Sequence, residues 1–374
     1  MNQKKKILFV IPSFRFGGTC SSLKSILRTI ERDFDISILA LSSYGQEKAY
    51  FSSYKILEPD KLLYFWEVDS RSLKNKTFVC YIVKIFRKFT SMFGLNFASW
   101  VYRASSSKQY LKGFDIVVGF QEGVATYFVS YLVCNRKISW VHCNLRYSNY
   151  SHKDNIKAYQ KYDDIVFVSN TTKSVFVELY PLLKDKTQTI YNIIDYENIS
   201  KQSQEPLIDK CQFDRFTIVS VGRLAPIKRF HLIPSMVKEL KARGKNVQWL
   251  ILGEGSERQK IQDEIVKNNV ENDVLMLGYI SNPAPYLKSS DLYVCTSQSE
   301  ACPMVFLESY LLGTYVLSTD FSSAFEIIDS ITGRISTQED LVQSIVEIME
   351  NPVKVIPNIE LQNNNKLMLY KLFQ

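Results

Sequence analysis

Residues 216–230 read FTIVSVGRLAPIKRF, and this stretch decides the fold. Its first six residues form a mostly apolar run of strand length, as expected for a strand that is buried on both faces. Gly222 ends the run, a basic loop follows, and a helical pattern spans residues 231–243. A strand, a short loop and a helix in this order are the repeating unit of a parallel sheet.

The same alternation continues in both directions along the chain. Runs such as DIVVGF and DDIVFVSN are continuous apolar stretches, which is typical of parallel strands. The strands are expected at residues 7–12, 35–41, 61–65, 115–120, 137–142, 164–169, 187–191, 216–222, 247–252, 274–277, 292–296 and 315–319. The pattern predicts an α/β chain with doubly wound sheets and right-handed crossovers.

A polar, aperiodic segment at residues 195–215 interrupts the alternation. We therefore expect two Rossmann-like domains of similar size that face each other across a cleft, with ligands at the carboxyl ends of the strands. The expected parts are an acceptor-binding domain at 1–195, a linker at 196–215, a nucleotide-binding domain at 216–352 and a tail at 353–374. The tail is expected to pack on the first domain as a last helix.

Composition narrows the class of protein. The 374 residues are 46% apolar and 22% charged, which excludes a largely disordered or fibrous chain. No apolar run reaches about 18 residues without a charge, so no membrane-spanning helix is expected. The seven cysteines are odd in number and form no C-x-x-C pair, which favours a reducing cytoplasm over a disulfide framework or a zinc site.

Positive charge is concentrated near the start of the chain. Residues 1–110 hold 18 Lys and Arg against 8 Asp and Glu, a balance of +10, while the remainder holds 28 against 30. Such a domain favours an anionic partner, and because no nucleic-acid motif is present we expect no nucleic acid. Residues 72–93 join a basic strip to aromatic flanks, as in a helix lying in a membrane interface. The alternative is a helix docked on its own domain with a solvated basic edge.

The stretch SQSEACPMVFLE, residues 297–308, follows an expected strand and holds two glutamates, Glu300 and Glu308. Pro303 suits the first turn of the next helix, whose free N–H groups would form an anion-binding start. Those N–H groups belong to Ala301, Cys302, Met304 and Val305. Glu308 would accept hydrogen bonds from vicinal hydroxyls such as those of a ribose. The alternative is ordinary helix capping with a solvated glutamate.

Further candidates lie on three other loops. Arg223 and Lys228 follow Gly222, and two fixed cations there would offset the charge of a departing nucleotide diphosphate. Gly17 and Gly18 follow the first strand and allow close backbone approach to a ligand, although they do not form G-x-G-x-x-G. His142 ends the strand ISWVH; taken alone, such a histidine is more often structural.

Together these residues resemble the retaining GT-B glycosyltransferases of glycosyltransferase family 4, especially the bacterial capsule and exopolysaccharide members. The resemblance rests on ILFVIPSFRFGG, ISWVH, SVGRLAPIKRF, LGEG and the long stretch at residues 274–320, which runs from VLMLGYISNPAPYL to GTYVLSTD. It implies a hexosyltransferase that uses a nucleotide-sugar donor, with UDP preferred because it is common in that family. No metal site is expected, since the two cations would take the place of a metal ion.

The resemblance also implies roles for individual residues. Arg223 and Lys228 match the pair that binds the donor diphosphate, and Gly222 and Gly253 lie in the matching glycine segments. Glu300 matches the glutamate beside the donor sugar and Glu308 the one that holds the ribose. The remaining matches are His142 near the reaction centre, Gly17 and Gly18 under the diphosphate and acceptor, and Tyr279 and Ile280 along the nucleobase.

Two departures from the family pattern are visible. Ala301 follows Glu300 where the family usually has glycine, and the segment from Gly313 to Val316 lacks the usual proline. The expected acceptor is a lipid-linked saccharide in surface polysaccharide synthesis, reached from the cytoplasmic face of the membrane. The alternatives are a protein or simple lipid acceptor, or a non-catalytic GT-B partner protein.

Overall fold

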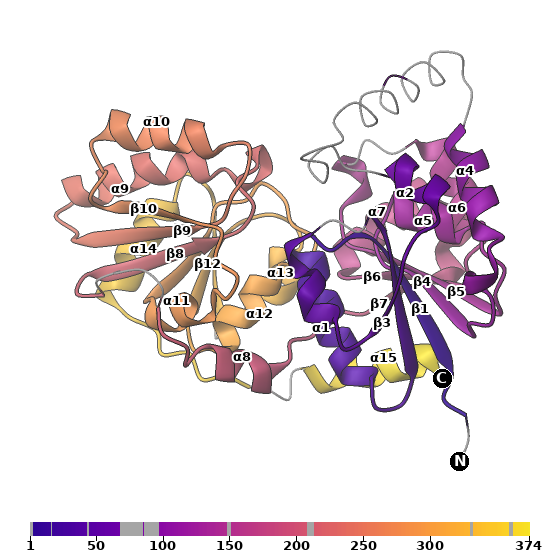
Figure 1. The fold of residues 1–374 in the computed structure, drawn as a ribbon. Coiled ribbons are helices and arrows are strands. Elements are labelled where there is room, and N and C mark those ends of the chain that lie inside the picture. The colour runs from indigo at the N-terminus through magenta and orange to yellow at the C-terminus, as the bar shows by residue number, and fades with distance from the viewer. Residues whose placement is uncertain are drawn as a thin grey trace. The chain divides into compact units, whose positions relative to one another are not determined.

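The computed structural model describes residues 3–15, 17–42, 45–67, 85, 97–147, 151–207, 213–329, 332–358 and 362–374. The chain divides into two compact units. The first consists of Met1–Tyr191 and Leu367–Gln374, and the second of Asn192–Lys366 (Figure 1). The helix expected at 72–93 lies outside the described residues, except for Ile85.

The first unit is built on a seven-stranded parallel sheet in the order β3-β2-β1-β4-β5-β6-β7. Its strands are β1 (Lys6–Ser13), β2 (Asp35–Ser42), β3 (Lys55–Leu57), β4 (Ile116–Gly119), β5 (Arg136–Val141), β6 (Asp164–Phe167) and β7 (Thr187–Thr189). Its helices are α1 (Gly18–Ile30), α2 (Lys61–Glu67), α4 (Phe97–Ser106), α5 (Val124–Val129), α6 (His152–Tyr159) and α7 (Asn170–Leu179), with part of α15 (Asn363–Phe373).

The second unit is built on a six-stranded parallel sheet in the order β10-β9-β8-β11-β12-β13. Its strands are β8 (Phe216–Val221), β9 (Val247–Leu252), β10 (Val274–Gly278), β11 (Leu292–Cys295), β12 (Tyr315–Thr319) and β13 (Gly333–Ser336). Its helices are α8 (Tyr196–Gln202), α9 (Ile233–Ala242), α10 (Arg258–Asn268), α11 (Ala284–Ser289), α12 (Met304–Leu311), α13 (Ala324–Ile327) and α14 (Leu341–Glu350).

Successive residues along the strands of the second sheet pack alternately into two different hydrophobic cores. Ile218 and Val294 pack in one cluster with α9, α10 and α14, while Val219 and Tyr293 pack in another with α11. Figure 1 shows α9 and α10 on one side of this sheet and α11 on the other. The strands are therefore buried on both faces, which explains their continuous apolar sequence.

Two expectations about local structure and boundaries were wrong. Residues 61–65 form part of helix α2 rather than a strand, because the Asp60 carboxylate accepts the N–H of Leu63 at 3.0 Å and thereby caps the first turn. The segment 196–215 is not only a linker, since Tyr196–Gln202 is helix α8, capped by Asp195. The second unit accordingly begins at Asn192 and extends to Lys366.

The end of the chain belongs to the first unit. Residues Leu367–Gln374 lie with that unit, on which the tail was expected to pack. The Phe373 ring contacts Phe9 and Phe34, with ring centroids 5.9 and 6.0 Å apart, and the Tyr370 hydroxyl donates to the carbonyl of Thr29 at 2.5 Å. A segment far along the sequence thus completes the core beside β1.

Candidate active site

The candidate residues of the second unit lie where its strand order reverses. The chain runs outward from β8 through β9 to β10 and then returns to β11, which pairs with β8 in parallel. Loops that leave two such neighbouring strands in opposite directions leave a crevice at the carboxyl edge of the sheet, where ligands of doubly wound folds bind. Residues 222–229 follow β8 and residues 296–303 follow β11, so both predicted loops meet at this point.

An ion pair joins these two loops. The Lys228 ammonium donates to the Glu300 carboxylate, and the Ser297 hydroxyl donates to the same carboxylate oxygen at 2.7 Å. The Thr296 hydroxyl also donates to the carbonyl of Lys228, at 2.7 Å. The side chains of Lys228 and Glu300 are only 24% and 16% exposed, so the pair is a fixed part of the edge.

The charge on Lys228 is secured by its neighbour. Burial alone would lower the pKa of this ammonium group, but the Glu300 carboxylate outweighs burial and raises the pKa above its ordinary value. Arg223, five residues earlier on the same loop, acts in the opposite direction and lowers this pKa. Arg223 is itself exposed. The edge therefore holds the cations Lys228 and Arg223 together with the Glu300 carboxylate.

Glycines allow three loops to stack beside this pair. A methyl group at Gly253 would overlap the carbonyl oxygen of Gly222, and one at Gly255 would overlap that of Leu224. The N–H of Gly253 donates to the carbonyl of Gly278 at 2.7 Å, and Gly278 adopts a φ of +76°. The loops after β8, β9 and β10 are consequently in backbone contact. Tyr279 and Ile280 follow the last of them, with Ile280 buried.

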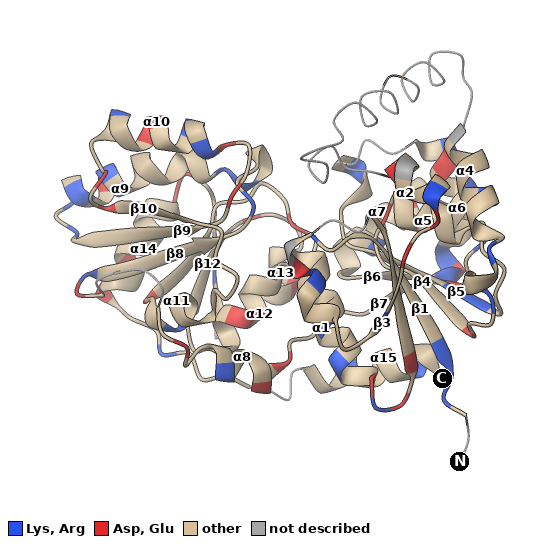
Figure 2. Ribbon diagram, in the orientation of Figure 1, with Lys and Arg blue, Asp and Glu red and all other residues tan. Residues whose placement is uncertain are grey.

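Helix α12 follows Glu300 and carries Glu308. Pro303 is the residue before its first turn, and Glu308 is the one acidic position of its sequence MVFLESYL. Figure 2 shows red, the colour of Asp and Glu, on α12. The buried phenol of Tyr293 lies near both glutamates: burial raises its pKa first, and Glu300 and Glu308 raise it further.

The residues just before and at the start of α12 are mostly buried, and two side chains hydrogen-bond to their backbone. Ala301, Cys302 and Met304 are buried, and Val305 is half-buried. The Asn192 amide donates to the carbonyl of Cys302 at 2.9 Å, and the Ser323 hydroxyl donates to the carbonyl of Glu300 at 2.6 Å. Sequence reasoning missed Asn192, Ser297 and Ser323; a hydroxyl three residues before Glu300 was the one available signal.

The first sheet has a matching reversal between β1 and β4. Gly17 and Gly18 follow β1, Glu122 follows β4, and His142 follows β5. The backbone N–H of His142 donates to the Glu122 carboxylate at 2.8 Å. Burial raises the pKa of Glu122 and lowers that of His142 to about 3. Among the described residues, the buried Nε2 atom of His142 has no hydrogen-bond partner. Sequence reasoning missed Glu122.

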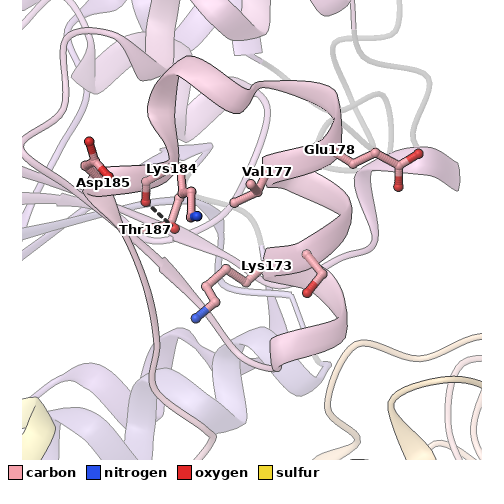
Figure 3. A pocket seen from close by; sticks show the side chains of 7 residues that line it. Lys173, Val177, Glu178, Lys184, Asp185 and Thr187 are labelled. Atoms are coloured by element: carbon pink, nitrogen blue, oxygen red, sulfur yellow. Dashed lines mark hydrogen bonds between the residues drawn. The ribbon is translucent and has the colours of Figure 1, made fainter.

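A shallow pocket of about 600 Å³ lies elsewhere in the first unit. It is lined by Lys173 and Val177 of α7 and by Lys184, Asp185 and Thr187 near the start of β7 (Figure 3). The Thr187 hydroxyl donates to the carbonyl of Lys184 at 2.7 Å. Because the pocket borders the amino end of an edge strand, it is separate from the strand ends that carry the candidate residues.

The described parts of the chain contain neither a metal-binding cluster nor a membrane-spanning helix. No group of three or more His, Cys, Asp or Glu side chains there is arranged to hold a metal ion. Within the same ranges, no helix combines the length and the apolar character needed to cross a bilayer.

Two Rossmann-like α/β units with parallel sheets define the GT-B fold, and comparison with solved structures confirms this architecture. The Anabaena protein HepE, solved in complex with UDP-glucose, superposes with a TM-score of 0.70 over 98% of this chain and 98% of its own, at 16% sequence identity. Residues 198–366 match the family model described as Glycosyl transferases group 1. The matched region contains the Lys228–Glu300 pair and helix α12.

Curated relatives align over part of their length. An uncharacterized glycosyltransferase of Methanocaldococcus jannaschii is 31% identical over 168 residues, which cover 44% of this chain and 41% of the relative. The N-acetylgalactosamine-N,N'-diacetylbacillosaminyl-diphospho-undecaprenol 4-alpha-N-acetylgalactosaminyltransferase of Campylobacter jejuni is 31% identical over 165 residues, covering 44% and 43%. The matched part thus spans about two fifths of these relatives.

Proposed function

We propose that the protein is a glycosyltransferase that moves a sugar from a nucleotide diphosphate donor, UDP-sugar by preference, to a hydroxyl group with retention of anomeric configuration. The observation that carries the proposal is the Lys228–Glu300 pair at the β8–β11 reversal, beside Arg223 and the start of α12. The match of residues 198–366 to the group 1 glycosyltransferase model supports it.

In the proposed reaction, the bond between the anomeric carbon and the diphosphate oxygen breaks, and its electron pair leaves with the diphosphate. Lys228 and Arg223 stabilise the developing negative charge, which is the largest demand of the step. The acceptor oxygen bonds to the anomeric carbon from the same face, and its proton passes to the departing diphosphate. The two cations supply the charge compensation, so the proposal includes no metal ion.

The donor is proposed to lie along the second unit. Glu308 accepts the ribose hydroxyls, Glu300 contacts the donor sugar, and Tyr279 and Ile280 border the nucleobase. The glycine-assisted stacking of the loops at Gly222 and Gly253 lets backbone approach the diphosphate closely. The acceptor is proposed to bind on the first unit at Gly17, Gly18 and His142. Since His142 has a pKa of about 3, it acts there as a neutral hydrogen-bonding group.

The proposed acceptor is a lipid-linked saccharide used in capsule or exopolysaccharide synthesis, presented at the cytoplasmic face of the membrane. The name of the Campylobacter jejuni relative, which includes diphospho-undecaprenol, supports this class of acceptor. The excess of positive charge in residues 1–110 is consistent with a diphosphate-bearing lipid or an anionic surface. A protein or simple lipid acceptor and a non-catalytic GT-B partner are the competing readings.

The first test is thermal denaturation with UDP, GDP, ADP, CMP and dTDP. A ligand present at about 100 times its Kd stabilises the protein by roughly 2.7 kcal/mol. We expect one diphosphate, UDP, to raise the Tm of the wild type and to have no effect on Glu308→Ala. Glu347→Ala on α14, an exposed glutamate outside the site, is the matched control and should respond like the wild type.

The second test measures UDP release from UDP-N-acetylhexosamines with a polyprenyl-diphosphate-linked N-acetylhexosamine as acceptor. Acceptor-dependent release that is lost in Glu308→Ala would support the proposed transfer. Nucleotide binding without turnover on lipid-linked, lipid or peptide acceptors would favour the non-catalytic reading. If no nucleotide diphosphate binds and no sugar is transferred, the proposed function is wrong.

A further inference from the structure

The loop between β1 and α1, which the structure describes at residues 14, 15 and 17, is held in place by a short segment that follows β2. That segment is the 3-10 helix η1 (Gln46–Phe51) together with Gly45, the residue before it. Because β1 lies at the reversal of the first sheet, its loop borders the point where a ligand is expected. The segment therefore acts on backbone that the proposed function assigns to the acceptor.

Contacts among the described residues join the segment to the loop itself. The N–H of Glu47 donates to the carbonyl of Phe14 at 3.1 Å. The rings of Phe14 and Phe51 pack with centroids 5.4 Å apart. A methyl group at Gly45, where φ is +151°, would overlap the same Phe14 carbonyl, so the backbone of the segment lies directly against the loop.

The segment also contacts helix α1. The Lys24 ammonium pairs with the Glu47 carboxylate, whose side chain is only 9% exposed. Lys24 lies 4.2 Å above the centroid of the Tyr50 ring, and the Arg28 guanidinium lies 5.3 Å from the same ring. Since Lys24 and Arg28 are four residues apart, both belong to one face of α1. Residues 45–51 thus contact both the loop after β1, at Phe14, and helix α1, at Lys24 and Arg28.

The start of α1 depends on such external support. The helix begins at Gly18 after Gly17, no side chain caps it, and its first turn contains no acidic residue. Gly17 adopts a φ of +151° with open space where a side chain would be, so no side chain anchors the chain at this position. Backbone N–H groups at such a start suit phosphate or sugar hydroxyl oxygens only if their direction is fixed.

We propose that residues 45–51 form a latch for the glycine loop, and that Glu47 is a positioning residue through its ion pair with Lys24. The latch fixes the Gly17–Gly18 backbone for the phosphate or hydroxyl groups of the acceptor. This inference rests on the proposed function, in which that loop binds the acceptor. A buried ion pair adds little net stability, but it specifies geometry in some folds, and here it specifies where α1 begins.

The test uses three variants: Glu47→Gln, Lys24→Met and the double variant that carries both substitutions. Each is compared with the control variant Glu58→Gln. The control breaks the exposed Lys48–Glu58 pair, 3.0 Å long, which involves the same segment without touching the loop. Hydrogen–deuterium exchange of residues 17–20 and steady-state kinetics with the polyprenyl-diphosphate acceptor are measured for each. The double variant leaves no unpaired buried charge and is available if a single variant fails to fold.

We expect exchange at residues 17–20 to become at least tenfold faster and kcat/KM for the acceptor to fall at least tenfold. UDP affinity and the donor KM should stay within twofold, because those groups lie in the other unit, and Glu58→Gln should match the wild type. The double variant should change exchange and kcat/KM no more than the single variants do, as expected for one shared interaction.

Unchanged exchange at residues 17–20 would overturn the latch. Faster exchange with unchanged acceptor kinetics would overturn the positioning role. A wild type that transfers no sugar would refute the proposed function, while exchange would still report on the latch.

Discussion

Lys228 and Glu300, 72 residues apart in the sequence, form an ion pair across the β8–β11 reversal of the second sheet. Their loops are tied together a second time by the backbone, since the N–H of Gln298 donates to the carbonyl of Ile227 at 2.8 Å. The cation proposed to meet the donor diphosphate is therefore already engaged with a carboxylate. A diphosphate at this edge must compete with Glu300 or share Lys228 with it.

Glu300→Gln tests this competition. The amide keeps the shape of the side chain and removes its charge, so Lys228 becomes available to the diphosphate. We expect UDP affinity to be retained or to rise a few-fold, while sugar transfer falls about 100-fold because the charge beside the donor sugar is lost. Titration calorimetry with UDP and the transfer assay check the two halves of the prediction.

Lys228→Met removes the cation of the pair and keeps the carboxylate, which is the reverse of Glu300→Gln. It removes a diphosphate contact and leaves the Glu300 carboxylate in a mostly buried site, at a cost of about 1–3 kcal/mol in stability. UDP affinity should fall at least tenfold. If Glu300→Gln weakened UDP binding as strongly as Lys228→Met does, the idea that Glu300 competes for Lys228 would be wrong.

His142 should remain neutral throughout the physiological range. Burial lowers its pKa to about 3, so the folded protein binds this proton far less readily than the unfolded chain, whose histidine has a pKa near 6.5. Between pH 6.5 and about 3 the unfolded chain binds a proton at this histidine and the folded protein does not. The free energy of unfolding is therefore unaffected by His142 above pH 6.5 and decreases as the pH falls from there toward 3. The transfer rate should accordingly show no inflection from His142 between pH 5 and 8.

The chain offers a direct measurement, since it has three histidines, at positions 142, 152 and 231. Proton NMR of the imidazole Cε1–H groups should show a resonance that does not titrate down to pH 5 and that disappears in His142→Gln. Both other resonances should persist in that variant. A midpoint near 6.5 for the missing resonance would contradict the buried, neutral state.

The sequence predicted which residues follow which strands better than it predicted how strands and loops are brought together. Gly222, Arg223 and Lys228 after one strand, and Glu300 after another, were placed by the apolar runs before them. Their proximity depends on β11 pairing with β8 rather than with β10, which is a matter of topology. Periodicity within a segment carries no information about which strands become neighbours.

Local misreadings have equally specific causes. The run LLYF within residues 61–65 is as apolar as a strand, and only the Asp60 cap shows that a helix begins there. Glu122 and Glu47 were overlooked because a lone glutamate in a loop resembles any solvated side chain. Their burial arises from tertiary contacts with His142 and Lys24, residues 20 and 23 positions away.

Gly255→Ala should damage the second unit far more than an ordinary glycine substitution. A methyl group there would overlap the carbonyl of Leu224, so the loop after β9 would have to move away from the loop that carries Arg223. We expect a loss of more than about 2 kcal/mol in stability and weaker UDP binding. Gly244→Ala is the control: its φ of +73° is also unfavourable for alanine, but the space is open, so only about 1 kcal/mol should be lost. Equal losses at the two positions would show that loop stacking is not what requires Gly255.

Phe373→Ala should destabilise the first unit although position 373 is distant in sequence from β1. Its side chain is fully buried against Phe9 and Phe34, and the neighbouring Leu372 carbonyl accepts a hydrogen bond from Arg136 at 2.6 Å. Truncation of a buried phenylalanine costs about 3–5 kcal/mol. Leu367→Ala, at a position 54% exposed on the same helix, should cost less than about 0.5 kcal/mol.

Urea denaturation gives the loss of stability for both variants, and hydrogen exchange of β1 locates the effect. Faster exchange in β1 with β8 unchanged is the result expected if α15 completes the first core. A loss below about 1 kcal/mol in Phe373→Ala would mean that the helix rests on that core without supporting it.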